Sequence, residues 1–100
     1  SHITGGGIAE NLLRVLPKNV GAEISLDQLD FHKKNSIFNW LQKNCNLSQK
    51  EMLKTFNCGI GMILIIKRKD LEKFFIFSKK IKQPIKVLGK ITNNKNIIFI

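Results

Sequence analysis

The chain has 100 residues, enough for one domain with a modest hydrophobic core. Its composition of 43% hydrophobic and 24% charged residues is typical of a globular domain and excludes a disordered or low-complexity one. No apolar run approaches the length of a membrane span and no secretory signal pattern is present. We therefore expect a cytoplasmic protein whose two cysteines, Cys45 and Cys58, are reduced.

The net charge is +10, because 17 basic side chains face seven acidic ones. Such a balance favours an acidic partner, which could be nucleic acid, an anionic membrane or a phosphorylated metabolite. Nucleic-acid-binding surfaces commonly combine arginine and aromatic residues with their other basic side chains, whereas this chain has two Arg and no Tyr. We expect neither a specific nucleic acid nor a membrane as partner, and interpret most of the lysines as a solvated face.

The N-terminal stretch predicts a strand, a glycine-rich turn and a helix. Residues 1–4, SHIT, read as the end of a strand, and residues 4–7 form a tight loop. The apolar spacing of residues 8–16 predicts a short helix with one buried side. Glu10 falls in its first turn and Arg14 lies four residues later, the spacing of an ion pair on a helix.

The middle of the chain predicts one strand and two helices. Residues 21–26, GAEISL, alternate as a strand does, and the polar residues 27–35 form a connection. Helices are expected over residues 36–44 and 47–56. The side chains that mark their starts are Ser36 as an N-cap, and Ser48 with Glu51 as a capping box.

The C-terminal part predicts three more strands and one helix. Residues 60–66 are apolar throughout and suit a buried strand. A helix capped by Asp70 is expected over 70–81, and strands over 85–91 and 97–100 flank a turn. The helix is expected to turn four side chains inward: Leu71, Phe74, Phe75 and Phe77. The resulting order, β-α-β-α-α-β-α-β-β, predicts an α/β (α+β) domain in which helices pack on a mixed sheet.

The glycine-rich turn is the first candidate site. A strand, a glycine-rich turn and a helix form a geometry that binds phosphate, because a backbone without Cβ atoms approaches an anion closely. The hydroxyl of Thr4 and the guanidinium of Arg14 could contact the same oxygens. The sequence TGGG matches neither the P-loop nor the dinucleotide fingerprint, so glycines that only allow close packing are the alternative interpretation.

The second candidate site is the stretch TFNCGIGM, residues 55–62, where two glycines flank one isoleucine before the predicted buried strand. Thr55 and Asn57 offer polar groups beside it. Cys58 is either a nucleophile or, with no base recognisable nearby, a small buried thiol. His2 is either an acid or ligand beside the first loop or a hydrogen-bonded structural histidine. Neither histidine nor cysteine spacing suggests a metal site.

Three stretches in this order, HITGGG…ENLLRVLP, IFNWLQ and TFNCGIGM, resemble the C-terminal domain of the aminoimidazole ribonucleotide synthetase (phosphoribosylformylglycinamidine cyclo-ligase) family, from His2 to Ile100. The resemblance implies that residues 1–100 are a fragment of a two-domain enzyme, lacking the first strand and helix of the C-terminal domain. It also implies ATP-dependent ring closure of formylglycinamidine ribonucleotide to aminoimidazole ribonucleotide in purine biosynthesis. ATP and Mg²⁺ would be bound mainly by the N-terminal domain of a cytoplasmic homodimer, and the fragment would be inactive alone.

The resemblance also implies roles for the residues of the two candidate sites. Residues 4–7 become a phosphate cradle, and Asn11 and Arg14 become supporting or substrate-contacting groups. The second wall of an interdomain cleft would come from residues 55–61. No catalytic residue and no metal ligand is assigned. The full set of expected substrate- or phosphate-binding residues is His2, Thr4, Gly5, Gly6, Gly7, Asn11, Arg14, Thr55, Asn57, Cys58, Gly59 and Gly61.

The sequence departs from the family pattern before TFNCG, where Leu53 and Lys54 replace the usual Tyr and Arg. Lysine keeps the charge but loses the planar fork of donors. Three alternatives stay open. One is a sibling enzyme of the formylglycinamidine ribonucleotide synthetase, selenophosphate synthetase or thiamine monophosphate kinase type. The others are a basic nucleic-acid-binding module and a free-standing remnant with a structural or regulatory role.

Overall fold

The computed structural model describes the backbone of residues 1–100 and every side chain except that of His32. The elements in chain order are α1 (Gly7–Leu13), β1 (Gly21–Ile24), η1 (Leu26–Gln28), η2 (Asp30–His32), α2 (Ile37–Asn44), α3 (Gln49–Thr55), η3 (Arg68–Asp70), α4 (Leu71–Lys80), β2 (Gly89–Thr92) and β3 (Ile97–Phe99). The η elements are single 3₁₀ turns.

The three strands form one mixed sheet in the order β2-β1-β3. The central strand β1 runs antiparallel to β2 and parallel to β3, so that Ala22 lies opposite both Ile91 and Ile97. A mixed sheet accompanied by helices confirms the predicted α+β class.

One face of the sheet carries the hydrophobic core. Ala22 and Ile24 are two residues apart on β1 and both are buried, because alternate side chains of a strand share a face. The intervening Glu23 lies on the other face, where its carboxylate is 3.1 Å from the Lys90 ammonium on β2. The buried apolar set is completed from the helices and loops by Ile3, Ile8, Leu12, Leu29, Phe31, Met52, Cys58 and Ile60.

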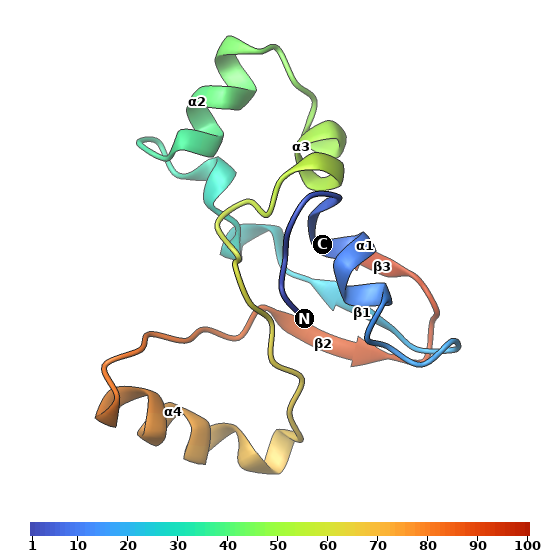
Figure 1. The fold of residues 1–100 in the computed structure, drawn as a ribbon, viewed down its shortest axis with the longest axis vertical. Coiled ribbons are helices and arrows are strands. Elements are labelled where there is room, and N and C mark those ends of the chain that lie inside the picture. Colours follow the sequence, from blue (N-terminus) through green and yellow to red (C-terminus); the bar gives the residue numbers. More distant parts are fainter.

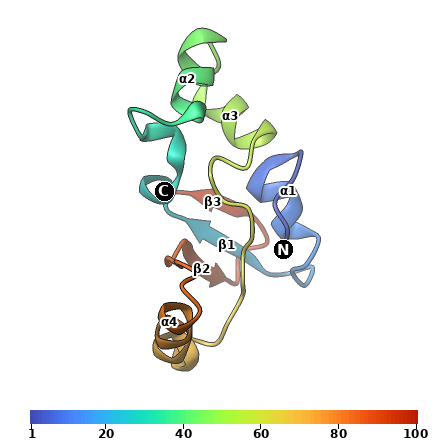
Figure 2. The ribbon, with the colours of Figure 1, turned by 60° about the vertical axis from the view of Figure 1, so that its left-hand side comes forward.

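The helices are distributed unevenly around this core. Helix α1 packs against α3, and α2 packs against η2 and α3 (Figure 1). Helix α4 stands apart at the lower end of the molecule in both ribbon views, and its neighbour along the chain is η3 (Figures 1 and 2). Within the described part of the chain, we find no helix with the length and apolarity that crossing a membrane requires.

Two predicted strands are corrected by the structure. Residues 1–4 and 60–66 pair with each other, but through a single antiparallel bridge between His2 and Met62 and not through full strands. The expected burial of 60–66 is wrong for Met62, Leu64 and Ile65, which are 60%, 62% and 46% exposed, whereas Ile63 is partly buried and packs against the core. Ile60 itself lies in the core. The pairing ends after this single bridge, so no regular strand forms.

The region 27–35 is the second correction, because it is more than a polar connection. It forms the 3₁₀ turns η1 and η2 and places Leu29 and Phe31 in the core, 1% and 0% exposed. Leu29 and Phe31 stand between polar residues in a stretch without helical or strand periodicity. Periodicity therefore could not predict that they are buried.

The predicted helix starts are largely confirmed. The Ser36 hydroxyl accepts a hydrogen bond from the Asn39 backbone N–H, and Ser48 with Glu51 forms the complete capping box. Asp70 stands at the N-cap of α4 but its side chain makes no cap hydrogen bond, which corrects the capping role expected of it. Phe77 is 57% exposed, contrary to the expected inward position, while the other three predicted residues of that face are partly buried.

Candidate functional site

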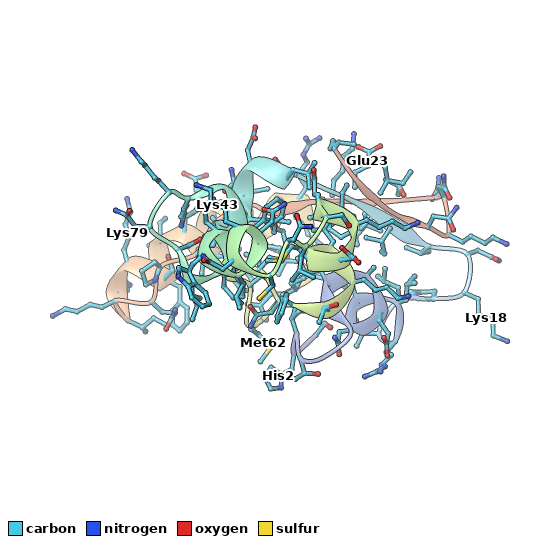
Figure 3. The ribbon with its side chains drawn as sticks, turned by 90° about the horizontal axis from the view of Figure 1, so that it is seen from above. His2, Lys18, Glu23, Lys43, Met62 and Lys79 are labelled. Atoms are coloured by element: carbon cyan, nitrogen blue, oxygen red, sulfur yellow. The ribbon has the colours of Figure 1, made fainter. Side chains whose placement is uncertain are left out.

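The two glycine-bearing stretches, far apart in the sequence, are neighbours in the structure. The Ile3 backbone N–H donates to the Gly61 carbonyl at 2.9 Å, beside the bridge between His2 and Met62. Figure 3 shows these two side chains together at one edge of the molecule. We call residues 4–7 the first glycine loop and residues 57–61 the second glycine loop. Their adjacency brings together the segments that carry the two loops, whereas Asn11, Arg14 and Thr55 lie on α1, at its end and on α3.

Asn11 connects α1 to the first glycine loop. Its side chain is buried, and its Nδ2 donates to the carbonyl oxygens of Gly7 at 2.7 Å and of Thr4 and Gly5 at 3.3 Å. Its Oδ1 accepts from the Thr4 hydroxyl at 3.2 Å. One side chain therefore satisfies both ends of the loop, which makes Asn11 a positioning residue with no free polar atom for a ligand.

Arg14 lies at the far end of α1 and its guanidinium is held by two neighbours. Nη1 donates to Asn11 Oδ1 at 3.3 Å, and Nη2 donates to Glu10 Oε1 at 2.5 Å, which confirms the predicted ion pair. Both charged groups are more than half exposed, so this pair contributes little to stability. These bonds use two of the five N–H donors of the guanidinium, so Arg14 can still donate to an anion.

The second glycine loop is shaped by its own asparagine. The side-chain Oδ1 of Asn57 accepts a hydrogen bond from the Gly59 N–H at 3.0 Å. The backbone carbonyl of Asn57 accepts one from the Ile60 N–H, also at 3.0 Å. The loop is tied to η2, because the Asp30 N–H donates to the Cys58 carbonyl at 2.8 Å. Asn57 thus plays for the second loop the positioning part that Asn11 plays for the first.

Cys58 lies inside the core and not on the surface of the loop. Its side chain is fully buried, and its Sγ lies 3.6 Å from the carbonyl oxygens of Met52 and Phe56. Burial, and secondarily the negative charge of Asp30, raises the pKa of the Cys58 thiol to about 11. At neutral pH the sulfur is therefore a protonated packing group and not a thiolate.

Two glycines of the site are required by the fold itself. Gly7 has φ +71°, and a Cβ there would lie 2.1 Å from the Leu53 carbonyl oxygen of α3. Gly59 has φ +91°, and a Cβ there would lie 2.2 Å from Asp30 Oδ2. A side chain at either position meets both an unfavourable backbone conformation and an occupied space. These glycines need no ligand to explain them.

Gly5 and Gly61 have no such structural requirement. Neither has a positive φ, and a Cβ at either position would meet no atom within 4 Å. Both are exposed, and the N–H groups of both donate to no other described residue. The backbone at these two positions is therefore open to an incoming group, which is the property that close approach to a phosphate requires.

Two carboxylates at the loops were missed as site residues by the sequence reasoning. Glu10 Oε2 lies against Gly6, where a Cβ would be 2.3 Å from it, and Asp30 lies against Gly59 in the same way. Asp30 is held by the Lys33 ammonium, 2.6 Å from its Oδ1. The position of Glu10 in the first turn of the helix was a signal for the first contact, whereas nothing in the sequence places residue 30 beside residue 59.

An open groove of about 630 Å³ begins at the first glycine loop and runs between α1 and α3. Its charged residues are Glu10 on α1 and Lys50 and Lys54 on α3, one turn apart, and its apolar floor includes Leu26 and Phe99. Leu53 and Lys54, the two residues at which the sequence departs from the expected family pattern, both line this groove. The groove places two positive charges beside the first loop, an arrangement that suits an anionic ligand.

The remaining expected residues lie at the margins of this site. His2 and Thr55 are both exposed, Thr55 as the last residue of α3. Among the described side chains no group of three or more His, Cys, Asp or Glu gathers as metal ligands do. The described residues therefore do not fit an Mg²⁺ site.

Comparison with known proteins decides the family. The family described as AIR synthase related protein, C-terminal domain, matches residues 1–100, the whole chain. The chain belongs to this family. The match covers both glycine loops and all three strands of the mixed sheet.

Two curated relatives are both named phosphoribosylformylglycinamidine cyclo-ligase. The protein of Nitrosococcus oceani is 43% identical over 91 residues, which are 91% of this chain and 25% of that protein. The protein of Neisseria gonorrhoeae is 50% identical over 72 residues, 72% of this chain and 20% of that protein. The chain spans about a quarter of the length of the curated relatives it matches.

Proposed function

We propose that this chain is the glycine-loop half of a phosphoribosylformylglycinamidine cyclo-ligase site. The enzyme closes the ring of formylglycinamidine ribonucleotide to aminoimidazole ribonucleotide in purine biosynthesis, with ATP. The observation that carries the proposal is the open backbone at Gly5 and at Gly61, on two segments joined by the hydrogen bond from Ile3 to Gly61, in a chain 43–50% identical to proteins with that name. The name of these relatives favours the cyclo-ligase over the sibling enzymes and over a nucleic-acid-binding module.

In this proposal the two loops hold a phosphorylated ligand, and they do so mainly with backbone. The free N–H groups of Gly5 and Gly61 donate to phosphate oxygens, and Lys50 and Lys54 supply positive charge beside the first loop. Asn11 and Asn57 position the loops without touching the ligand. Holding the ribonucleotide and ATP in register is the main catalytic demand of a phosphoryl transfer followed by ring closure.

The rest of the site lies on polypeptide outside these 100 residues. Because the described residues form no metal cluster, we propose that Mg²⁺ and most ATP contacts come from an N-terminal domain. The chain then acts within a cytoplasmic, homodimeric two-domain enzyme and does not catalyse alone. ATP supplies the phosphoryl group that activates the formyl oxygen when both parts are present.

The test is a chimera. The aligned part of the Nitrosococcus oceani cyclo-ligase is replaced by this chain, and ring closure is followed with formylglycinamidine ribonucleotide and ATP. We expect turnover by the chimera and none by the isolated chain. The natural enzyme and the same enzyme lacking the aligned part serve as controls. A chimera that folds and assembles like the natural enzyme but has no turnover would contradict the proposal.

A further inference from the structure

The segment 61–66 leaves the core as an extended chain that is paired along one edge. The Ile63 N–H donates to the Ser1 carbonyl at 2.8 Å, and the Ser1 amino group donates to the Ile63 carbonyl at 2.8 Å. With the bond from Ile3 to Gly61, these contacts flank the bridge of Met62. The Gly61 carbonyl and both backbone groups of Ile63 are therefore bonded to the N-terminal residues.

The other edge of the same segment is free. In an extended chain, the N–H and C=O groups of alternate residues point to opposite edges, so those of Met62 and Leu64 point away from residues 1–3. Neither residue makes a backbone hydrogen bond to any described residue. Their side chains are 60% and 62% exposed. An extended segment with unpaired backbone and exposed apolar side chains is a template for strand addition.

The surroundings of this edge are strongly basic. Residues 62–88 carry eight basic side chains against Asp70 and Glu72, a net charge of +6 out of the +10 of the whole chain. The basic residues are Lys67, Arg68, Lys69, Lys73, Lys79, Lys80, Lys82 and Lys86. Most of them lie on η3 and α4 or beside α4, which stands at the end of the free segment (Figure 1). The charge is therefore concentrated beside the free edge.

We propose that the free edge of residues 61–66 binds an extended polypeptide strand that lies outside these 100 residues, is apolar at alternate positions and is flanked by Asp or Glu. Main-chain hydrogen bonds to Met62 and Leu64 call for a polypeptide, since neither a lipid surface nor a nucleic acid offers a matching row of donors and acceptors. In a pair of identical chains, residues 62–88 of one copy, with a net charge of +6, would face the same charge on the other copy. This repulsion opposes self-pairing.

The experiment measures amide hydrogen exchange of the chain by NMR with a synthetic probe peptide. The probe alternates Val and Thr and carries two Glu at each end. We expect the Met62 and Leu64 amides to exchange at least about ten-fold more slowly with saturating probe, as new ladder bonds form. The Ile63 amide, already bonded to Ser1, is the internal control and should change little.

Two altered probes and one pair of variants separate the parts of the proposal. A probe N-methylated at alternate amides and a probe with Lys in place of Glu should each bind at least about ten-fold more weakly. Leu64→Ala should weaken binding of the parent probe, whereas Leu13→Ala, an exposed leucine on α1, should not.

Four results would overturn the proposal. Equal binding of the N-methylated probe would exclude strand pairing, and equal binding of the Lys probe would exclude charge selection. Protection of Met62 and Leu64 in a dimer without any probe would assign the edge to a second copy. Protection by vesicles of anionic phospholipid but not by the parent probe would assign it to a lipid surface.

Discussion

Asn11 and Gly7 are joined by the shortest of the three hydrogen bonds that the Asn11 amide makes to the first glycine loop, 2.7 Å from Nδ2 to the carbonyl oxygen. The two residues lie one helical turn apart, so the bond fixes the start of α1 to the loop that precedes it. The loop thus has a defined shape before any ligand arrives, which reduces the entropy cost of binding.

Removing the amide of Asn11 is expected to cost much stability. Asn11→Asp keeps the shape of the side chain but replaces the Nδ2 donor by an oxygen that faces three carbonyl groups. We expect a loss of about 3 kcal/mol in the free energy of unfolding, measured by urea denaturation. Asn44→Asp is the control, because Asn44 is exposed and donates to a single carbonyl, that of Trp40. Equal losses at the two positions would contradict the role of Asn11.

The glycines of the two loops should separate into two classes when replaced by alanine. Gly7→Ala should destabilise the fold by about 2 kcal/mol or more, because of its positive φ and the Leu53 carbonyl. Gly5→Ala and Gly61→Ala should change the melting temperature little, since a Cβ at either position enters open space. Thermal unfolding of the variants checks this, and a Gly61→Ala variant as unstable as Gly7→Ala would contradict it.

The two cysteines should differ sharply toward a thiol reagent. Cys45 is exposed and should react quickly at pH 8, whereas buried Cys58 should react only when the chain unfolds. Alkylation of Cys45→Ser and Cys58→Ser variants, timed against unfolding, measures both rates. Reaction of Cys58 at the rate of Cys45 would contradict its burial.

Cys58 also predicts a loss of stability in alkali. Its pKa is about 11 in the folded chain against an ordinary 9.0, so the folded state holds the proton more tightly. The protonated Cys58 thiol therefore makes its full contribution to the free energy of unfolding below pH 9, and this contribution is lost as the pH rises toward 11. Urea denaturation at increasing pH should show this loss in the natural chain and much less of it in Cys58→Ala.

The capping box of α3 predicts the opposite dependence in acid. The pKa of the Glu51 carboxyl is lowered from its ordinary 4.5, mainly by the hydrogen bond from the Ser48 backbone N–H and less by that from the Ser48 hydroxyl. A carboxylate whose pKa is lower in the folded chain stabilises the fold at pH values above its ordinary pKa. This stabilisation is lost as the pH falls through the pKa of the folded chain. Glu51→Gln should thus destabilise the chain at neutral pH and much less in acid. Glu72→Gln, which removes no hydrogen bond to a described residue, is the control, and a pH-independent Glu51→Gln effect would contradict the cap.

Local features of the fold were predictable, and features that depend on distant partners were not. The caps at Ser36 and Ser48 depend on residues three positions away, so the sequence pattern was sufficient. A strand over 60–66 depends on a partner segment that pairs along its length, and residues 1–3 pair only with residues 61–63. The burial of Phe31 depends on how η2 turns into the core, which no periodicity records.

The candidate site shows the same division. The two glycine-bearing stretches were singled out in the sequence as candidate sites, and the hydrogen bond from Ile3 to Gly61 joins the two segments. The contact of Asp30 with Gly59 joins residues far apart in the chain and had no sequence signal. The difference between a glycine required by packing and one open to a ligand, as between Gly7 and Gly5, needs the neighbours in space.

The most direct test of the central claim uses Gly5→Ala and Gly61→Ala in the cyclo-ligase chimera. Since neither methyl group meets an atom in the structure, the variants should fold and melt like the parent chimera. We expect kcat/KM for formylglycinamidine ribonucleotide or for ATP to fall by about ten-fold or more, because the methyl group occupies the space of a phosphate. Variants that fold normally and turn over both substrates like the parent chimera would contradict the claim that these loops hold a phosphorylated ligand.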